Sequence, residues 1–129
     1  MRVLQPLEWA RPRGYANGIE ARGRMIFVAG QIGWDKDQHF HAKDFAGQFE
    51  QALLNILAVL READAGPEHI VRMTWYITDK KAYLSDKRIG PIYRRIMDRH
   101  FPTMSVVVVS ALIEDEALVE IEATAVVPD

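Results

Sequence analysis

The stretch that decides the fold reads Val119-Glu120-Ile121-Glu122-Ala123-Thr124-Ala125-Val126. Its apolar and polar residues alternate, which is typical of a β-strand with one apolar and one polar face. An acidic turn, Glu114-Asp115-Glu116, separates it from a second β-branched run, Val106 to Val109, which follows Phe101-Pro102. We therefore predict two strands here. Glu120, on a stiff strand, would be held firmly enough for general acid–base chemistry.

The rest of the chain predicts four more strands and two helices around this pair. Apolar runs between turn signals indicate strands near 1–4, 18–20, 24–32 and 70–78, and we expect the second to pair with the third. Apolar residues at three- and four-residue steps predict helices over 44–65 and about 84–99. The order β-β-β-α-β-α-β-β indicates an α+β fold, with one mixed six-stranded sheet and two helices on one of its faces.

The other face of such a sheet would be left uncovered. The strands carry apolar residues on both faces, and Val106 to Val109 has no polar alternate at all. An uncovered apolar face needs a partner, and the usual partner is a second copy of the same chain. We therefore expect a homo-oligomer.

Length and composition restrict the class of protein. We expect one domain spanning residues 1–129, and a net charge of −2 without a basic patch argues against a nucleic-acid partner. The absence of cysteine excludes a disulfide framework and a thiol nucleophile. No apolar run has the length of a signal peptide core or a membrane span, so we expect a cytoplasmic protein without a membrane partner.

Few residues suggest chemistry by themselves. His39 and His41 could place two imidazoles on one side of a loop, but no third ligand has a recognisable spacing, so solvated histidines are favoured over a metal site. No phosphate-binding glycine loop is present, and no cofactor is expected. Glu120 and Tyr15 remain as candidates. From the residues alone, a solvated or salt-bridged carboxylate is favoured over a catalytic role for Glu120, and Tyr15 is also explained by a packing aromatic.

Residues spread over most of the chain resemble the Rid family, the reactive intermediate deaminases also called L-PSP-type enamine/imine deaminases. The matching segments are Tyr15, 26–31, 51–55, 70–79, Tyr93, Phe101-Pro102 and 119–126. The resemblance implies a chorismate-mutase-like fold and a homotrimer whose sheets form a central barrel, with ligand clefts between subunits. In the family a glutamate of the last strand, matched by Glu120, activates the water that attacks a small imine such as that from 2-aminoacrylate. Tyr15 and Gly30 match residues that line the cleft.

Three positions depart from the family pattern. Met104 stands where an arginine pairs with the substrate carboxylate, Ala29 stands where a serine is usual, and Gly90 lies near a common asparagine. Each change removes a polar group, so we expect the usual small 2-imino acids to bind at least about tenfold more weakly. Arg11 or Arg13, beside Tyr15, could supply the missing cation.

The leading hypothesis is therefore a deaminase-like hydrolase that releases ammonia from a different small aminated metabolite. Glu120 would be catalytic, and Tyr15, Ala29, Gly30 and Met104 would bind the substrate. The alternative is a non-catalytic trimer that binds a small metabolite. A ribonuclease, implied by some family names, is disfavoured by the slightly acidic charge and the lack of a histidine pair or basic groove.

Overall fold

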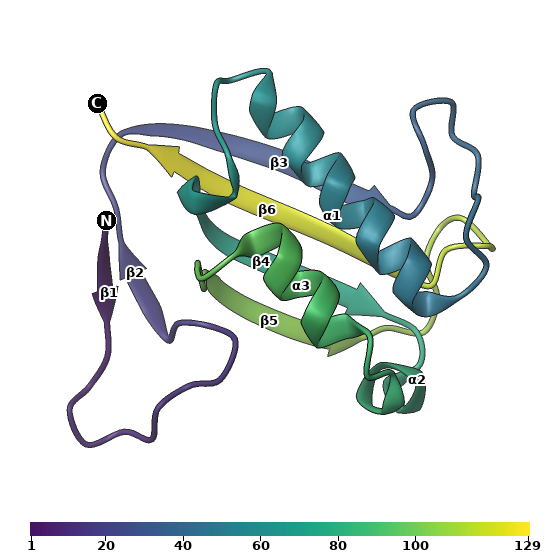
Figure 1. The fold of residues 1–129 in the computed structure, drawn as a ribbon, viewed down its shortest axis with the longest axis horizontal. Coiled ribbons are helices and arrows are strands. Elements are labelled where there is room, and N and C mark those ends of the chain that lie inside the picture. The colour runs from purple at the N-terminus through teal and green to yellow at the C-terminus, as the bar shows by residue number, and fades with distance from the viewer.

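The computed structural model describes residues 1–129 and follows the predicted order of elements, with two short additions (Figure 1). The strands are β1 (Arg2–Leu4), β2 (Gly18–Glu20), β3 (Arg24–Ile32), β4 (Ile70–Ile77), β5 (Thr103–Val108) and β6 (Val119–Val127). The helices are α1 (Phe45–Arg61), the 3-10 turn η1 (Pro67–His69), α2 (Lys80–Ser85) and α3 (Ile89–Met97). None of these helices combines the length and the apolar character that a bilayer crossing requires.

The prediction of a single six-stranded sheet is wrong. The structure has a four-stranded mixed sheet in the order β3-β6-β4-β5 and a separate two-stranded sheet of β1 and β2. The expected pairing of β2 with β3 is therefore also wrong, because β2 pairs with β1 through Leu4 and Gly18. Gly23 redirects the chain between them at φ 144°, a conformation that favours glycine. A β-carbon at Gly23 would lie 2.0 Å from the carbonyl oxygen of Val127, so the turn is also tight.

The helix predicted over 84–99 is shorter in the structure, where α3 spans Ile89–Met97, and a separate helix, α2 (Lys80–Ser85), precedes it. Asp79 accepts a hydrogen bond from the backbone N–H of Ala82 (3.0 Å) and caps α2, a helix that the sequence does not predict. The chain then turns at Asp86, whose carboxylate accepts hydrogen bonds from Arg88. Pro91 falls in the first turn of α3, where a backbone N–H is not needed, so it does not break the helix.

The three helices lie on one face of the four-stranded sheet (Figure 1). Buried apolar side chains from the helices and the sheet meet there; among them are Phe49, Leu53, Ile56 and Leu60 of α1 and Met73, Trp75 and Ile121 of the sheet. The predicted stripe on α1 and the predicted alternation of β6 are both confirmed. The opposite face is uncovered, and on it Met25, Phe27 and Val107 are exposed. We call this surface the open face.

Gln48 is the one buried polar side chain in the core, and it holds the start of β6. Its Nε2 donates to the carbonyl oxygens of Ala42 (3.2 Å) and Glu116 (2.9 Å). Its Oε1 accepts from the N–H of Leu118 (2.8 Å). A buried amide with all these partners is satisfied, so it ties the loop before β6 to α1 without a desolvation penalty. These hydrogen bonds therefore fix where Val119 and Glu120, at the start of β6, lie relative to α1.

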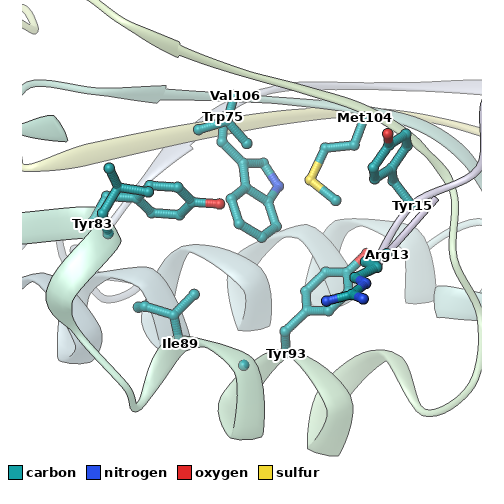
Figure 2. A pocket seen from close by; sticks show the side chains of 11 residues that line it. Arg13, Tyr15, Trp75, Tyr83, Ile89, Tyr93, Met104 and Val106 are labelled. Carbon is teal, nitrogen blue, oxygen red and sulfur yellow. The ribbon is translucent and has the colours of Figure 1, made fainter.

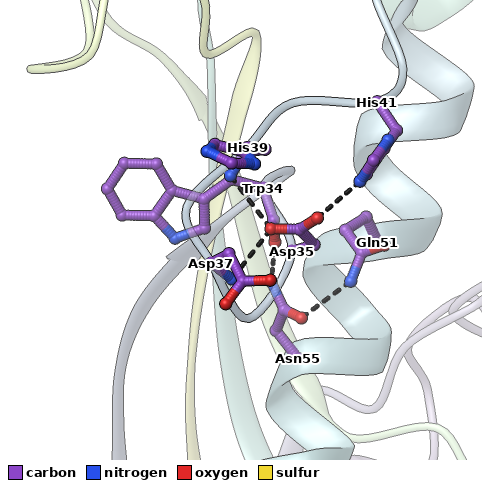
Figure 3. Close-up of polar contacts among 7 residues, drawn as sticks. All are labelled: Trp34, Asp35, Asp37, His39, His41, Gln51 and Asn55. Carbon is purple, nitrogen blue, oxygen red and sulfur yellow. Dashed lines mark hydrogen bonds and ion pairs between the residues drawn. The ribbon is translucent and has the colours of Figure 1, made fainter.

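The loop after β3 is held by Asn55 and Asp35 (Figure 3). Asn55 donates to the carbonyl oxygens of Ile32 (3.1 Å) and Trp34 (2.8 Å), which joins the end of β3 to α1. Asp35 accepts from the N–H groups of residues 37 and 39 and lies 2.5 Å from Nε2 of His41. The backbone hydrogen bond from residue 39, together with the His41 contact, lowers the pKa of Asp35 to about 2. The imidazole of His41 is thus paired with the carboxylate of Asp35 in this loop.

The lowered pKa predicts how stability responds to acid. A carboxyl group whose pKa is lowered in the folded chain stabilises the fold above its unfolded pKa of about 4 and loses that contribution as the pH falls to about 2. Asp35→Asn cannot ionise, so its free energy of unfolding should fall less steeply than that of the wild type between pH 4 and 2. Urea titrations at each pH measure this slope. Asp37→Asn, which alters a carboxylate without a hydrogen bond, is the control, and equal slopes for wild type and Asp35→Asn would contradict the assignment.

Candidate functional site

A pocket of about 540 Å³ opens at the β5 edge of the sheet, on the face that carries the helices (Figure 2). Trp75, Met104 and Val106 form its sheet side. The helices α2 and α3 and the loop before β2 complete the wall with Arg13, Gly14, Tyr15, Tyr83, Leu84, Ile89, Gly90 and Tyr93. The lining is therefore mostly apolar and aromatic, as is usual in sites for small organic ligands.

Tyr15 reaches this pocket because its neighbour pairs with the start of β5. Ala16 forms an isolated parallel bridge with Thr103, and its N–H donates to the carbonyl oxygen of Pro102 (3.0 Å). The side chain of Tyr15 then lies near Met104 (Figure 2). The structure thus brings together two of the predicted binding residues from distant parts of the sequence. Of the two candidate cations, Arg13 lines the pocket and Arg11 does not.

Two polar atoms in the pocket wall are buried without a partner. They are Nε1 of Trp75 and the hydroxyl of Tyr93, which belong to side chains that are 3% and 6% exposed. The rings themselves are well packed, since Trp75 meets Phe49 and Tyr93 edge-on at 4.7 and 5.4 Å between centroids. Burial raises the pKa of the Tyr93 hydroxyl, so it stays protonated at neutral pH. The pocket holds no carboxylate or imidazole, so it can bind a ligand but has no general base of its own.

The predicted catalytic residue, Glu120, lies elsewhere, against a bulge in β3. Ala29 and Gly30 together stand opposite Glu122, between the paired residues Val28 and Gln31. The carboxylate of Glu120 lies over Gly30, where an added β-carbon would be 2.4 Å from Oε2. Any larger residue at this position would displace the carboxylate, which explains the glycine. Ala29 lines a separate cavity of about 450 Å³ on the open face.

Glu120 and Met104 point to opposite faces of the sheet. Glu120 pairs with Tyr76 of β4, whereas Met104 pairs with Met73, and these two β4 residues differ by an odd number of positions. Glu120 therefore shares the open face with Tyr76 and Glu122, while Met104 faces the helices. A single chain cannot place both side chains around one small ligand, and a site that uses both must combine two copies.

Comparisons with known proteins agree with the fold and the sequence pattern. The model of the family described as Endoribonuclease L-PSP matches residues 9–127. The chain belongs to the Rid (L-PSP) family. It is 32% identical to the RutC family protein UK114 of Drosophila melanogaster over 96% of this chain and 88% of that protein. It is 33% identical to TdcF of Escherichia coli K12, a proposed reactive intermediate deaminase, over 87% of this chain and 85% of that protein.

Solved structures of the Rid family show the same arrangement. The Rid family protein YyfB of Yersinia pestis has a TM-score of 0.83 and 31% identity, with 98% of both chains covered. E. coli TdcF with bound serine has a TM-score of 0.71 and 30% identity, covering 98% of this chain and 99% of that one. The α+β fold of this Rid chain, with helices on one face of a mixed sheet, is thus common to its relatives.

In this Rid protein Trp75 and Tyr93 are both buried. Their unpartnered polar atoms depend on tertiary packing, and no sequence pattern indicates them. Tyr83 lies in helix α2, which the sequence does not predict, so no sequence signal places it in the pocket. Gly90, which lies near a common asparagine of the Rid family, lines the pocket together with Met104, so two of the three departures concern this one cavity.

The unpartnered hydroxyl of Tyr93 predicts an unusual response to mutation. Tyr93→Phe removes a buried group that makes no hydrogen bond, so the free energy of unfolding should stay constant or rise by about 1 kcal/mol. Tyr76→Phe is the matched change with a partner, because the hydroxyl of Tyr76 donates to Glu122 (2.7 Å), and it should lower stability. Urea denaturation measures both. A larger loss for Tyr93→Phe than for Tyr76→Phe would show that the Tyr93 hydroxyl has a partner in solution.

Proposed function

We propose that this protein is an enamine/imine deaminase-like hydrolase that releases ammonia from a reactive aminated metabolite. The family and its deaminase relatives support the reaction type. Met104 and the apolar pocket support a substrate that differs from the imine of 2-aminoacrylate, because the cation expected for a small carboxylate is missing from that position. No cofactor or metal is needed, since water supplies the oxygen and the leaving group is ammonia.

The observation that carries the proposal is the position of Glu120. Its carboxylate lies on the central strand β6, against the backbone of Gly30, and makes no hydrogen bond within the chain, whereas Glu122 accepts one from Tyr76. A partly buried carboxylate without a partner, held by a rigid strand, is available to a water molecule or a substrate nitrogen.

The reaction then needs one proton carrier. Protonation of an enamine on carbon by solvent gives an iminium ion, the protonated form of the imine. Water adds to the iminium carbon while Glu120 accepts one of its protons, so a C–O bond forms, the C=N bond becomes single and a neutral amino alcohol results. The protonated Glu120 returns its proton to nitrogen and the C–N bond breaks. Ammonia leaves while the hydroxyl group releases its remaining proton to solvent, which replaces the proton taken up at the start and leaves a carbonyl product. Tyr15, Ala29, Gly30 and Met104 would line the site in which this happens.

A homotrimer would assemble this site. Because Glu120 and Met104 face opposite sides of the sheet, one copy would supply Tyr15 and Met104 and another Gly30 and Glu120. The exposed apolar side chains of the open face, such as Phe27 at 71% exposure, support its burial in a central barrel.

Glu120→Gln tests the catalytic role. A proton carrier typically contributes about 10² to 10⁴ in rate, so this variant should release ammonia from enzymatically generated enamines at least about 100-fold more slowly. Glu122→Gln is the matched control, because it makes the same change two residues away on the same face. Circular dichroism checks that both variants fold. Equal rates for wild type and Glu120→Gln would refute the assignment.

The assembly is tested by its mass in solution. Sedimentation at micromolar concentration should give three times the chain mass of 14.7 kDa. Phe27→Asp, which places a charge on the open face, should dissociate the trimer and reduce ammonia release together with it. Val59→Asp changes an exposed residue of α1 and should leave the mass unchanged. A wild-type monomer would remove the proposed site.

A metabolite-binding protein without catalysis is the second candidate. It is favoured by one observation: the pocket beside Tyr15 and Met104 is mostly apolar and is lined by no carboxylate or imidazole. A binding protein would be stabilised by its ligand in a thermal-shift assay while releasing no ammonia.

A further inference from the structure

The apolar pocket contains one charged group, the guanidinium of Arg13. Every other lining residue is uncharged, and Arg13 takes part in none of the ion pairs of the chain. Guanidinium groups bind carboxylates with two parallel hydrogen bonds, which makes a free arginine at the mouth of a pocket a suitable anchor for an acid. Arg13 belongs to the loop before β2, whereas Met104 belongs to β5. The guanidinium therefore reaches the pocket from a different element than the one that carries Met104.

The walls offer two further polar atoms. Nε1 of Trp75 and the hydroxyl of Tyr93 are buried and have no partner within the chain, which destabilises the empty protein. In Figure 2 the indole nitrogen of Trp75 lies on the side of the ring toward Met104. Methionine has a flexible side chain that adapts to a ligand, so a polar atom of the ligand beside Met104 could reach these groups.

The size of the pocket exceeds the needs of a three-carbon acid. Its volume of about 540 Å³ lies within the range of roughly 300–1,000 Å³ found for drug-sized ligands. Trp75, Tyr83 and Tyr93 present aromatic rings, and Ile89 adds an aliphatic wall. A small imine would leave most of this apolar surface unfilled, whereas a ring or a long aliphatic group would cover it.

We propose that the pocket selects 2-imino acids with a large, aromatic-like side chain that ends in a polar atom. Arg13 binds the carboxylate in place of the arginine that Met104 replaces. The apolar body of the ligand packs against Trp75 and Tyr83, and its polar atom pairs with the Tyr93 hydroxyl or the Trp75 N–H. This inference rests on the proposed function, since it names the substrate class of that same site.

Binding of unreactive 2-oxo acids tests the selection without requiring catalysis, because their carbonyl stands in for the imine. Isothermal titration calorimetry would compare pyruvate, phenylpyruvate and 4-hydroxyphenylpyruvate. Burial of an aromatic side chain should make both larger acids bind at least about tenfold more tightly than pyruvate. Equal affinity for pyruvate and the aromatic acids, or no binding of the aromatic acids, would overturn the proposal.

The role of Arg13 is tested by Arg13→Gln, with Arg11→Gln as the matched control. Arg13→Gln should weaken binding of phenylpyruvate by about tenfold or more, because it removes a charge-assisted pair. Arg11 lies two residues away in the same exposed loop but outside the pocket, so its variant should bind normally. Equal losses in the two variants would indicate a general charge effect and would overturn the assignment of Arg13.

The polar end of the ligand is tested by Tyr93→Phe and Trp75→Phe. The wild type should prefer 4-hydroxyphenylpyruvate to phenylpyruvate. At least one of these variants should lose that preference, measured as the ratio of the two affinities within the same variant. Retention of the preference in both variants, or its absence from the wild type, would overturn this part.

Ammonia release is measured separately. Selective binding with no ammonia release would contradict the proposed function alone, and ammonia release from small imines only would contradict this inference alone.

Discussion

The packing of α1 on one face of the four-stranded sheet determines what every strand residue can do. The side chains of alternate β6 residues pack against an apolar stripe of α1, formed by Phe49, Leu53, Ile56 and Leu60. The intervening β6 residues must therefore face the other side of the sheet. Glu120 and Glu122 consequently stand on a face that no helix covers. A shift of β6 by one residue would bury both carboxylates and expose the core, so the register is strongly specified.

The position of Glu120 along the strand has a second origin in Gln48. The amide of this side chain holds the backbone on both sides of Ala117, immediately before β6 begins. At the other side of the strand, Gly30 leaves room for the Glu120 carboxylate. The buried amide of Gln48 and the missing β-carbon of Gly30 thus both determine where the Glu120 carboxylate lies. On the opposite face, the Ala16–Thr103 bridge does the same for Tyr15 and Met104.

The strands and helices with strong periodicity were predictable, and the short elements were not. The alternation of 119–126 and the stripe of α1 each involve many residues, so local pattern and tertiary structure agree. β1 and β2 contain three residues each, and nothing in so short a segment indicates which neighbour it will pair with. Helix α2 depends on the side chain of Asp79 reaching one particular N–H, which its sequence does not distinguish from a turn. The proximity of Tyr15 to Met104 depends on a long-range bridge, and the sequence suggested it only through family resemblance.

The strand order has a consequence for how the protein is made. β6 lies between β3 and β4, yet it follows both of them in the sequence. Until residues 119–127 have left the ribosome, β3 and β4 have no shared neighbour, and α1 has no complete surface to pack on. The nascent chain therefore exposes the apolar face of α1 and one unpaired edge each of β3 and β4 until β6 is available. Natural selection on this sequence must therefore act on the nascent, incompletely folded chain as well as on the folded protein.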